Sequence, residues 1–169
     1  NSAGASIGTL STTDPDAGDT ATYSITGTDA DSFELVGSTL KLKDLVSGDF
    51  ETKSSYSISL TATDTGSNTR TEAFTISVTD VNEAPTAVAL SASSFAENTS
   101  GPTIGTLSST DPDSDESFSY AISGTDASSF EVVGSSLKLK SSVSSDFETK
   151  SAYAITITST DSGGNTKSN

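Results

Sequence analysis

Acidic residues recur in this sequence as pairs separated by one residue. In an extended segment, side chains at positions i and i+2 point to the same side, so each pair would present two carboxylates together. Calcium binds about six to eight oxygens from carboxylates, Asn side chains and carbonyls. Each pair could therefore supply calcium ligands, although a single Asp-Pro-Asp stretch taken alone is more simply a polar turn. The pairs are Asp14/Asp16, Asp49/Glu51, Asp111/Asp113 and Asp146/Glu148.

A single segment near the middle of the chain concentrates the same chemistry. Asp80-Val81-Asn82-Glu83-Ala84-Pro85 places three oxygen-rich side chains in four consecutive positions and contains neither Lys nor Arg. Carboxylates brought within about 4–6 Å of each other repel and raise one another's pKa, whereas a divalent ion reverses the sign of the interaction. Bound calcium would neutralise this segment and stiffen it.

Composition excludes several other kinds of chemistry. The 169 residues include 23 acidic and 8 basic side chains, for a net charge of −15, which argues against nucleic acid as a partner. Cys, His, Met and Trp are absent, so the chain has no thiol nucleophile, no imidazole base and no ligands for a typical zinc site. No initiator Met, signal peptide or long apolar run is present, and we interpret the chain as part of a larger protein with no membrane insertion in this segment.

The elements that must position these residues are strands. Tyr56-Ser57-Ile58-Ser59-Leu60 and Phe74-Thr75-Ile76-Ser77-Val78 alternate apolar with small polar residues, which predicts strands with one buried face. The pair Gly37-Ser38 predicts a tight two-residue hairpin turn. Leu40 and Leu42 are then expected to face inward. No amphipathic helix is evident, so the expected fold class is all-β with many short strands.

An internal repeat organises the chain. Residues 7–16 reappear at 104–113 with an offset of 97 residues, and the same offset relates 1–72 to 98–169 without a gap at about 60% identity. A period of this length fits one β-sandwich per repeat. Residues 73–97 occur once, and they predict a last strand for the first repeat at 73–79 and a first strand for the second at 86–92.

The repeat and the ordered acidic motifs resemble the cadherin family, specifically the cadherin-like repeats of bacterial surface proteins. This resemblance implies two tandem Greek-key β-sandwich domains, cadherin-like and immunoglobulin-like, in an end-to-end rod. It implies a first repeat at 1–80 without its first strand, a calcium-binding linker at 81–85, and a second repeat at 86–169 without its last strand.

The resemblance also implies a set of metal ligands, because the family places calcium at domain junctions. Two departures from the family's pattern stand in the linker, where Glu83 replaces an Asp and Ala84 stands in the place of an Asn. The implied junction ligands are Asp49, Glu51, Asp80, Asn82, Glu83, Asp111, Asp113 and Asp161. Two half-sites that should bind weakly are also implied, Glu97 with Asp146 and Glu148, and Asp14 with Asp16 and Asp64.

The function that the resemblance implies is non-enzymatic. It is a structural or adhesive module of a secreted, cell-surface or filament-forming protein, whose calcium-stiffened repeats would bind neighbouring repeats of the same or an identical chain, or a surface protein or polysaccharide. The alternative is a carbohydrate-binding accessory module of a secreted polysaccharide-acting enzyme. Paired carboxylates also suit a glycosidase, but every pair occurs in both repeats and no insertion forms a pocket, which favours a scaffold.

The remaining repeated residues are expected to serve the fold. The four Tyr and seven Phe residues lie mostly at positions predicted to face inward, so we expect core roles for them rather than a sugar-binding platform. Asp29 and Asp126 fit no metal motif and are expected to be turn and surface residues. The lysines of the two Leu-Lys-Leu-Lys stretches, at 41, 43, 138 and 140, are expected to form a solvated strip that protects an edge strand.

Overall fold

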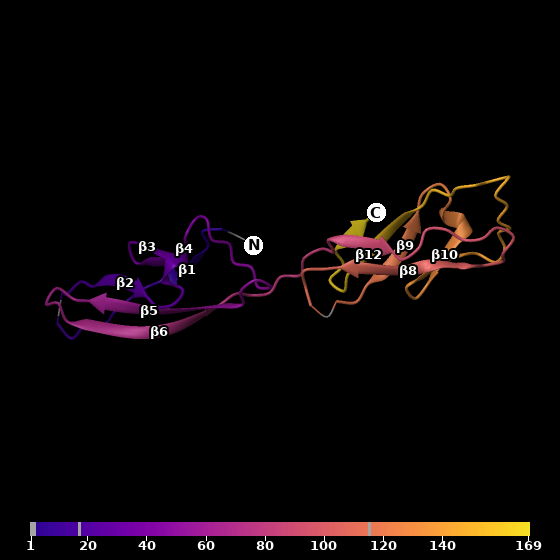
Figure 1. The fold of residues 1–169 in the computed structure, drawn as a ribbon. Helices are drawn as coiled ribbons and strands as arrows, with labels where there is room; N and C mark the ends of the chain where they lie inside the picture. Colours follow the sequence, from indigo (N-terminus) through magenta and orange to yellow (C-terminus); the bar gives the residue numbers. More distant parts are fainter. Residues whose placement is uncertain (1–2, 17, 115) are drawn as a thin grey trace. The chain divides into compact units, whose positions relative to one another are not determined.

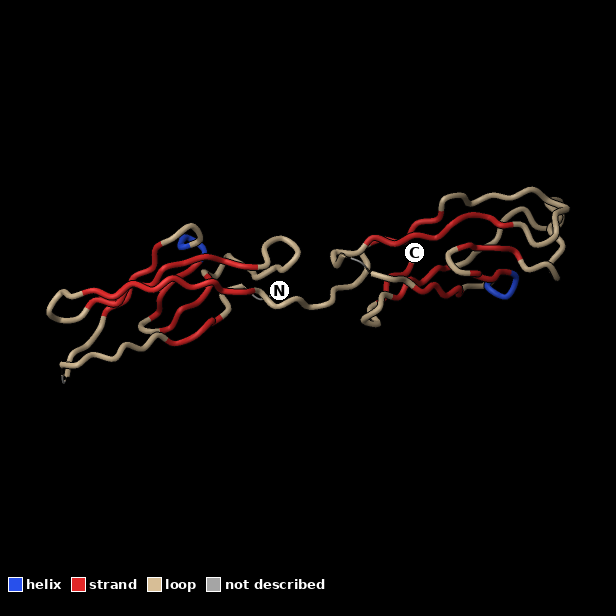
Figure 2. Tube along the Cα trace, turned by 90° about the horizontal axis from the view of Figure 1, so that it is seen from below, coloured by secondary structure: helices blue, strands red, loops and turns tan. Residues whose placement is uncertain are grey.

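The computed structural model describes residues 3–16, 18–114 and 116–169, and it is all-β apart from two short 3-10 turns (Figure 1). The chain forms two compact units, Asn1–Val81 and Asn82–Asn169. Among the described residues, no helix is long and apolar enough to cross a membrane. Each unit consists of two antiparallel sheets and one 3-10 turn, η1 (Ala30–Ser32) or η2 (Ala127–Ser129), which Figure 2 draws in blue.

The first unit contains two three-stranded sheets. One has the order β1-β4-β3 and the other the order β2-β5-β6. The first sheet consists of β1 (Ser6–Thr9), β4 (Thr39–Leu42) and β3 (Phe33–Val36). The second consists of β2 (Thr22–Thr26), β5 (Ser55–Thr63) and β6 (Thr69–Ser77). The β5–β6 pair is the longest in this unit, since all nine residues of β5 are paired from Ser55↔Ser77 to Thr63↔Thr69.

The second unit repeats this plan with one additional strand. Its sheets have the orders β10-β11-β8-β7 and β13-β12-β9. The first consists of β10 (Phe130–Val133), β11 (Ser136–Leu139), β8 (Thr103–Thr110) and β7 (Ala87–Leu90). The second consists of β13 (Thr166–Ser168), β12 (Thr156–Thr160) and β9 (Ser119–Ser123). β7 lies within the predicted first strand at 86–92.

Alternation of apolar and polar residues builds the core of each unit as predicted. Tyr56, Ile58 and Leu60 are buried on one face of β5, and Leu40 and Leu42 are buried on β4. Because these side chains come from both sheets, they pack with Phe33 into a single cluster between the layers. The corresponding cluster of the second unit contains Phe130, Leu137, Leu139 and Ile157. The predicted hairpin is confirmed, with Val36 paired to Thr39 and Gly37 at φ +63°.

The last strand of the first repeat differs from its prediction. It begins at Thr69 and ends at Ser77, whereas the sequence placed it at 73–79. The cause is the turn before it, in which the carboxylate of Asp64 accepts hydrogen bonds from the backbone and the side chain of Asn68, so that pairing starts at the next residue. Residues 69–72, the first four of β6, have repeat counterparts at 166–169. The second unit therefore contains the beginning of the equivalent strand, which is β13.

One expectation about side chains is wrong, and a second holds for most of the residues concerned but not for all of them. The lysines of the Leu-Lys-Leu-Lys stretches lie on or next to β4 and β11, which are central strands of their sheets, so they protect no edge. Lys41 instead forms ion pairs with Glu34 and Asp44. The aromatic residues lie both in the core and on the surface. Phe33, Tyr56 and Phe130 are buried, but Phe50, Phe74 and Phe147 are 37%, 45% and 63% exposed.

Candidate metal centre

The Asp-Pro-Asp stretches form turns that bring their carboxylates together. The backbone N–H of Asp113 donates to Oδ1 of Asp111 at 3.1 Å, and that of Asp16 donates to Oδ1 of Asp14 at 2.9 Å. This hydrogen bond closes a turn around the proline in both units. The paired acids are therefore close because the first one caps the turn, not because the segment is extended as the spacing suggested.

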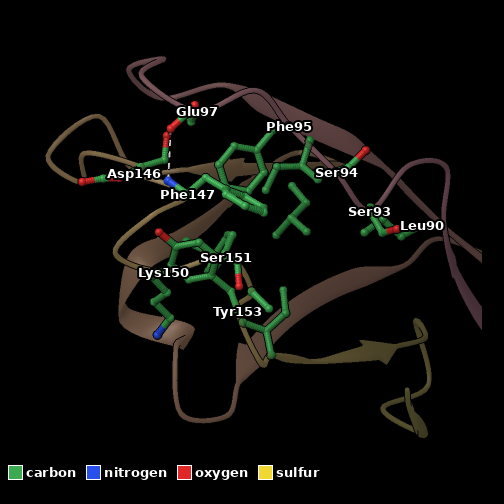
Figure 3. A pocket seen from close by; sticks show the side chains of 16 residues that line it. Leu90, Ser93, Ser94, Phe95, Glu97, Asp146, Phe147, Lys150, Ser151 and Tyr153 are labelled. Atoms are coloured by element: carbon green, nitrogen blue, oxygen red, sulfur yellow. Dashed lines mark hydrogen bonds between the residues drawn. The ribbon is translucent and has the colours of Figure 1, made fainter.

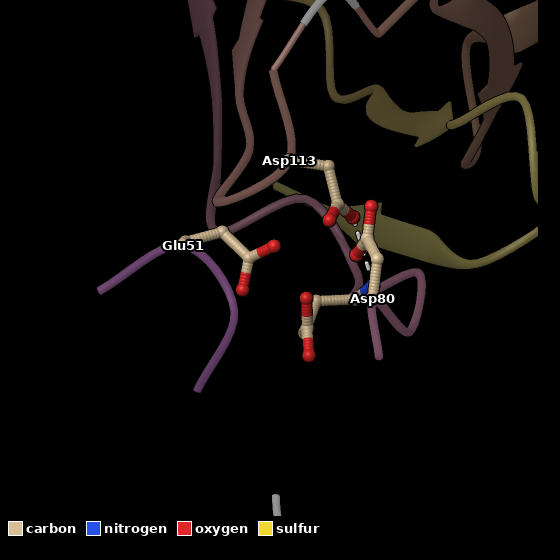
Figure 4. Close-up of side chains that lie close together, drawn as sticks. Glu51, Asp80 and Asp113 are labelled. Carbon is tan, nitrogen blue, oxygen red and sulfur yellow. Dashed lines mark hydrogen bonds between the residues drawn. The ribbon is translucent and has the colours of Figure 1, made fainter. Parts of the chain in front are cut away.

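In the second unit, the start of the chain segment 82–85 is held against this turn. The backbone N–H of Glu83 donates to Oδ2 of Asp113 at 2.8 Å, the bond drawn dashed in Figure 4. The Asn82 side chain donates from Nδ2 to Oδ2 of Asp161 at 2.9 Å. Asn165 donates from Nδ2 to the carbonyl oxygens of Asn82 and Glu83, at 3.1 and 3.0 Å. Asp113 and Asn165 thus fix the backbone of residues 82 and 83, and Asp161 fixes the side chain of Asn82.

Gly163 makes room for this arrangement. A Cβ atom at this position would lie 2.4 Å from Cγ of Asn82, a distance that real carbon atoms do not reach. Only glycine therefore permits the Asn82 side chain to reach Asp161, which is 6% exposed. Burial opposes ionisation of Asp161, but hydrogen bonds from Asn82, Asn165 and Gly164 outweigh it and lower the pKa of that carboxyl below its ordinary value. Asp161 is thus an anion in the folded unit.

Two carboxylate oxygens of this centre have the properties of metal ligands. Oδ2 of Asp111 and Oδ1 of Asp113 are buried and have no hydrogen-bond partner among the described residues. A buried carboxylate oxygen without a partner is costly, and a bound cation would remove this cost. A carboxylate oxygen of Glu83 also lies within 4.8 Å of one of Asp113. The donors are all oxygens, which suits calcium rather than a soft transition metal.

The first unit brings together a second group of predicted ligands. Glu51, in the turn before β5, and Asp80, after β6, each offer a carboxylate oxygen within 4.8 Å of the other (Figure 4). Asp49 is not part of this group. Its carboxylate accepts hydrogen bonds from the backbone and hydroxyl of Thr52, which lower its pKa, so it acts as the cap of the turn that carries Glu51.

The two predicted half-sites are brought together to different extents. Glu97, Asp146 and Glu148 offer three oxygens within 4.8 Å of one another, and Glu97 also accepts the backbone N–H of Phe147 (Figure 3). In the other group, Asp14 and Asp16 lie beside Asp19, a residue that the sequence analysis did not select. Asp64, which it did select, is outside that group and bonds to Asn68.

The same asparagine has different partners in the two units. Asn68 donates to its neighbour Asp64 at 2.9 Å, beside a cavity of about 190 Å³ that Asp14 and Asp19 also line. Its repeat counterpart Asn165 instead donates to the carbonyls of Asn82 and Glu83. The backbone N–H at this position therefore bonds to the aspartate of its own loop in both units, whereas the side chain bonds to that aspartate in the first unit and to residues 82 and 83 in the second.

Several residues that shape these sites were missed from the sequence. Besides Gly163 and Asn165, Glu116 accepts hydrogen bonds from the backbone and hydroxyl of Ser162, at 3.0 and 2.7 Å. Its counterpart Asp19 accepts one from Thr65. The signal that could have found them is the repeat, since Asp19 and Thr65 recur as the similar residues Glu116 and Ser162 at the same offset.

Asp29 and Asp126 are also more than turn and surface residues. Asp29 accepts hydrogen bonds from Nζ of Lys53 and the backbone N–H of Ser57, both at 2.7 Å, and its side chain is only 15% exposed. The Lys53 ammonium lies 5.0 Å from the ring centroid of Tyr56. In the second unit, Asp126, Lys150 and Tyr153 form the same arrangement. These hydrogen bonds and ion pairs hold each 3-10 turn against the rest of its unit. They have no role at the metal centre.

Comparison with known proteins identifies the family of these units. Residues 91–169 match the family model described as "Cadherin domain". The human protein "Protocadherin Fat 4" is 35% identical over 171 residues, covering 94% of this chain and 3% of that protein. This chain therefore spans a small part of that relative. These matches give no support to the narrower resemblance to repeats of bacterial surface proteins.

Solved structures agree with this result. The structure "Protocadherin gammaB7 EC3-6 cis-dimer" is 26% identical, covers 99% of this chain and 42% of its own, and has a TM-score of 0.71. The structure "Protocadherin Gamma B2 extracellular cadherin domains 1-5" has a TM-score of 0.69 at 23% identity, covering 100% of this chain and 35% of its own, and so supports the fold alone. The expected fold class, two tandem β-sandwiches of cadherin type, is confirmed.

Proposed function

We propose, from the premise that this chain belongs to the cadherin-domain family, that it is a calcium-binding structural and adhesive module of an extracellular protein. Cadherin domains are adhesion modules that bind calcium in general and are typically not enzymes. We propose that this module is likewise non-enzymatic, because every carboxylate pair occurs in both repeats, as expected of a scaffold.

The observation that carries the proposal is the pair of buried oxygens, Oδ2 of Asp111 and Oδ1 of Asp113, beside the backbone of Glu83. We propose that these atoms hold calcium with the remaining predicted ligands. Asp111, Asp113, Glu83 and Asp161, with the oxygen of Asn82, would contribute from the second unit, and Glu51 and Asp80, with Asp49 as cap or ligand, from the first. That both groups share the same ions is a proposal from their order in the sequence and from the family resemblance.

Bound calcium would act on the chain in two ways. Its charge would offset the repulsion among carboxylates at 80–83, where the chain carries no basic residue. It would also restrict the motion of the segment 81–85, which we propose as the linker between repeats at 1–80 and 86–169.

Small-angle scattering would test this stiffening of the linker. Calcium should narrow the distribution of distances within the molecule. Identical scattering profiles with calcium and with chelator would contradict the proposal.

Titration calorimetry tests calcium binding itself. We expect the variant with Asp111→Asn and Asp113→Asn to lose the tightest binding event, because two buried ligands lose their charge without losing their shape. The matched control changes the repeat counterparts, Asp14→Asn and Asp16→Asn, and should retain that event while losing only weak binding. Equal calcium uptake by both variants and the unmodified chain would overturn the proposal.

The partners that we propose are neighbouring repeats, in the same chain or in an identical one. The support is the kinship with adhesion proteins, since one similar structure is described as a "cis-dimer". The carbohydrate-binding alternative gains no support, because a sugar-binding platform needs several exposed aromatic rings in one plane and no such group is described. We also propose an extracellular location, which the matches to the cadherin family model and to protocadherin Fat 4 support.

A further inference from the structure

The loop between β7 and β8 contains the tripeptide Asn98-Thr99-Ser100, which the metal centre does not use. Asn-x-Ser and Asn-x-Thr, with any residue except proline in the middle, are the acceptor sequences for N-linked glycans. Of the asparagines at positions 1, 68, 82, 98 and 165, only Asn98 is followed two positions later by Ser or Thr. The repeat counterpart of the tripeptide is Asn1-Ser2-Ala3, in which the hydroxyl is missing. The acceptor sequence therefore distinguishes the second repeat from the first.

The side-chain amide of Asn98 differs from those of the other described asparagines. Each of the others donates from Nδ2 to a carboxylate or carbonyl oxygen, at 2.9 to 3.1 Å; they are Asn68, Asn82, Asn165 and Asn169. The side chain of Asn98 has no hydrogen-bond partner within residues 3–16, 18–114 and 116–169, and the residue is exposed. A group attached to its Nδ2 atom would therefore break no hydrogen bond to these residues.

The turn that contains Asn98 is held by other contacts. Asn98 has a φ of +59°, in the left-handed region that asparagine adopts more readily than most residues with a side chain. Its backbone N–H donates to the carbonyl oxygen of Ser145 at 2.9 Å. Oγ of Ser100 donates to the carbonyl oxygen of Ser141 at 3.3 Å. The backbone and the neighbouring side chain thus fix the turn, and the amide of Asn98 is not needed for it.

The acceptor lies next to the acidic group Glu97, Asp146 and Glu148. Glu97 directly precedes Asn98 and accepts the backbone N–H of Phe147 at 3.1 Å, the bond drawn dashed in Figure 3. The three carboxylates of the group offer oxygens within 4.8 Å of one another. Modification of Asn98 would leave all three carboxylates unchanged. A substituent on its Nδ2 atom would thus add bulk beside this group without removing an oxygen from it.

We propose that Asn98 is a site of N-linked glycosylation, with an oligosaccharide on a polyprenyl pyrophosphate carrier as the donor. Nδ2 of Asn98 forms a bond to the anomeric carbon of the first sugar and loses one proton. The bond from that carbon to the pyrophosphate oxygen breaks, and the carrier leaves as its pyrophosphate. The glycan adds a bulky hydrophilic group to the surface. This inference rests on the proposed extracellular location, because the transfer takes place in the secretory pathway.

The test expresses the full chain behind a secretory leader in cultured animal cells. Both secreted and cell-retained chains should show a mass excess that peptide-N-glycosidase removes. That enzyme leaves aspartate at the modified position, so mass spectrometry of peptides should locate the change at residue 98. Asn98→Gly should abolish the mass excess and preserve the turn, because glycine adopts the left-handed conformation without strain. Ser100→Ala should abolish it too, with Asn98 still in place.

A matched variant tests whether the unbonded amide matters. Arg70→Ser completes an acceptor tripeptide after Asn68, whose Nδ2 atom already donates to Asp64 at 2.9 Å. This variant should acquire less glycan, or its glycosylated form should melt at a lower temperature than the same variant made in bacteria. The chain glycosylated at Asn98 should melt no lower than the unmodified sequence made in bacteria. Full modification of Asn68 with an unchanged melting temperature would contradict this argument.

Three results would overturn the proposal. The first is a chain from animal cells without a glycan, and the second is a glycan that persists in Asn98→Gly. The third is a glycan at Asn98 that lowers the melting temperature. Calcium binding by the chain made in bacteria is measured separately. Calcium binding without glycosylation would overturn this inference alone, whereas glycosylation without calcium binding would overturn the calcium proposal alone.

Discussion

At the scale of single residues, the most restrictive position of the metal centre is a glycine. Gly163 is at a φ that any residue can adopt, so its role is space alone. Its repeat counterpart Gly66 faces the amide of Asn68, and a Cβ there would be 3.2 Å from Nδ2, which a small rotation relieves. The two glycines have the same place in the fold but different tolerance for a side chain.

Gly163→Ala is therefore expected to displace Asn82 and lower the free energy of unfolding by about 1–3 kcal/mol, as overpacking does. It should also weaken calcium binding, because Asn82 and Glu83 leave their positions together. Gly66→Ala should change both quantities much less. Thermal unfolding and calorimetry of both variants would measure this, and equal effects would show that the Asn82 contact is unimportant.

A second prediction at this scale concerns acid. Hydrogen bonds from Lys53 and from the Ser57 backbone hold the pKa of Asp29 below its ordinary value, against a small opposing effect of burial. A carboxylate with a lowered pKa stabilises the fold above its unfolded pKa of about 4, and this contribution is lost as the pH falls through the folded pKa. Asp29→Asn should thus lower the melting temperature at pH 7 and flatten its fall below about pH 4.

The control for this prediction is Asp31→Asn, which changes an exposed acid two residues away. It should leave the shape of the melting-temperature curve against pH unchanged. Asparagine at position 29 retains an oxygen for the Ser57 N–H but loses the charge that Lys53 binds, so the comparison isolates the ion pair. Curves of the same shape for the unmodified chain and Asp29→Asn would contradict the assignment.

At the scale of elements, the two units differ in the additional strand β7 and in the length of one strand pair. β5 and β6 pair over nine positions, whereas β12 and β13 pair over three named positions and end at Asn169. Backbone amides in a paired and buried strand exchange with solvent only when the structure opens locally. The segment 152–155 lacks such a pairing on one side.

Amides of Tyr153 and Ile155 should consequently exchange at least about tenfold faster than those of Tyr56 and Ile58. Hydrogen exchange followed by NMR measures each amide separately and compares repeat counterparts within one sample. Residues of the β10–β11 and β3–β4 hairpins serve as internal controls, because their pairings are identical in the two units. Equal rates at the tyrosines would mean that the edge is protected in another way.

The elements were predicted better than the site. Alternating side chains identified β5, and the Gly37-Ser38 pair identified the β3–β4 hairpin, because both signals are local. The start of β6 was placed four residues late, since the turn that begins it depends on hydrogen bonds between Asp64 and Asn68. The ligand candidates came from their order in the chain, but Asn165 and Gly163 act through contacts with Asn82, about 80 residues away, which no local pattern contains.

At the scale of the whole molecule, the net charge of −15 on 169 residues opposes the compact state. Calcium and simple salt should both relieve this repulsion, but by different mechanisms. Salt screens all exposed charges weakly, whereas calcium binds the folded state at particular oxygens. Millimolar calcium is expected to raise the melting temperature more than sodium chloride of the same ionic strength.

Scanning calorimetry with calcium, with chelator and with matched sodium chloride would measure the difference. At a calcium concentration about 100 times the dissociation constant, binding contributes about 2.7 kcal/mol per site. The variant with Asp111→Asn and Asp113→Asn should respond to calcium and sodium chloride nearly alike. A calcium effect that this variant retains in full would place the stabilising ion elsewhere.

The cores of the two units have a consequence for chemical durability. They are built from Leu, Ile, Val, Phe and Tyr, and the chain contains neither Met nor Cys nor Trp. Peroxide damages proteins mainly by converting thioethers to sulfoxides and thiols to sulfenic and higher acids, which introduces polar atoms into packed interiors. These units contain no sulfur atom that such oxidants could modify. Their cores should therefore keep their packing under oxidising conditions that would convert the methionines of another core to sulfoxides.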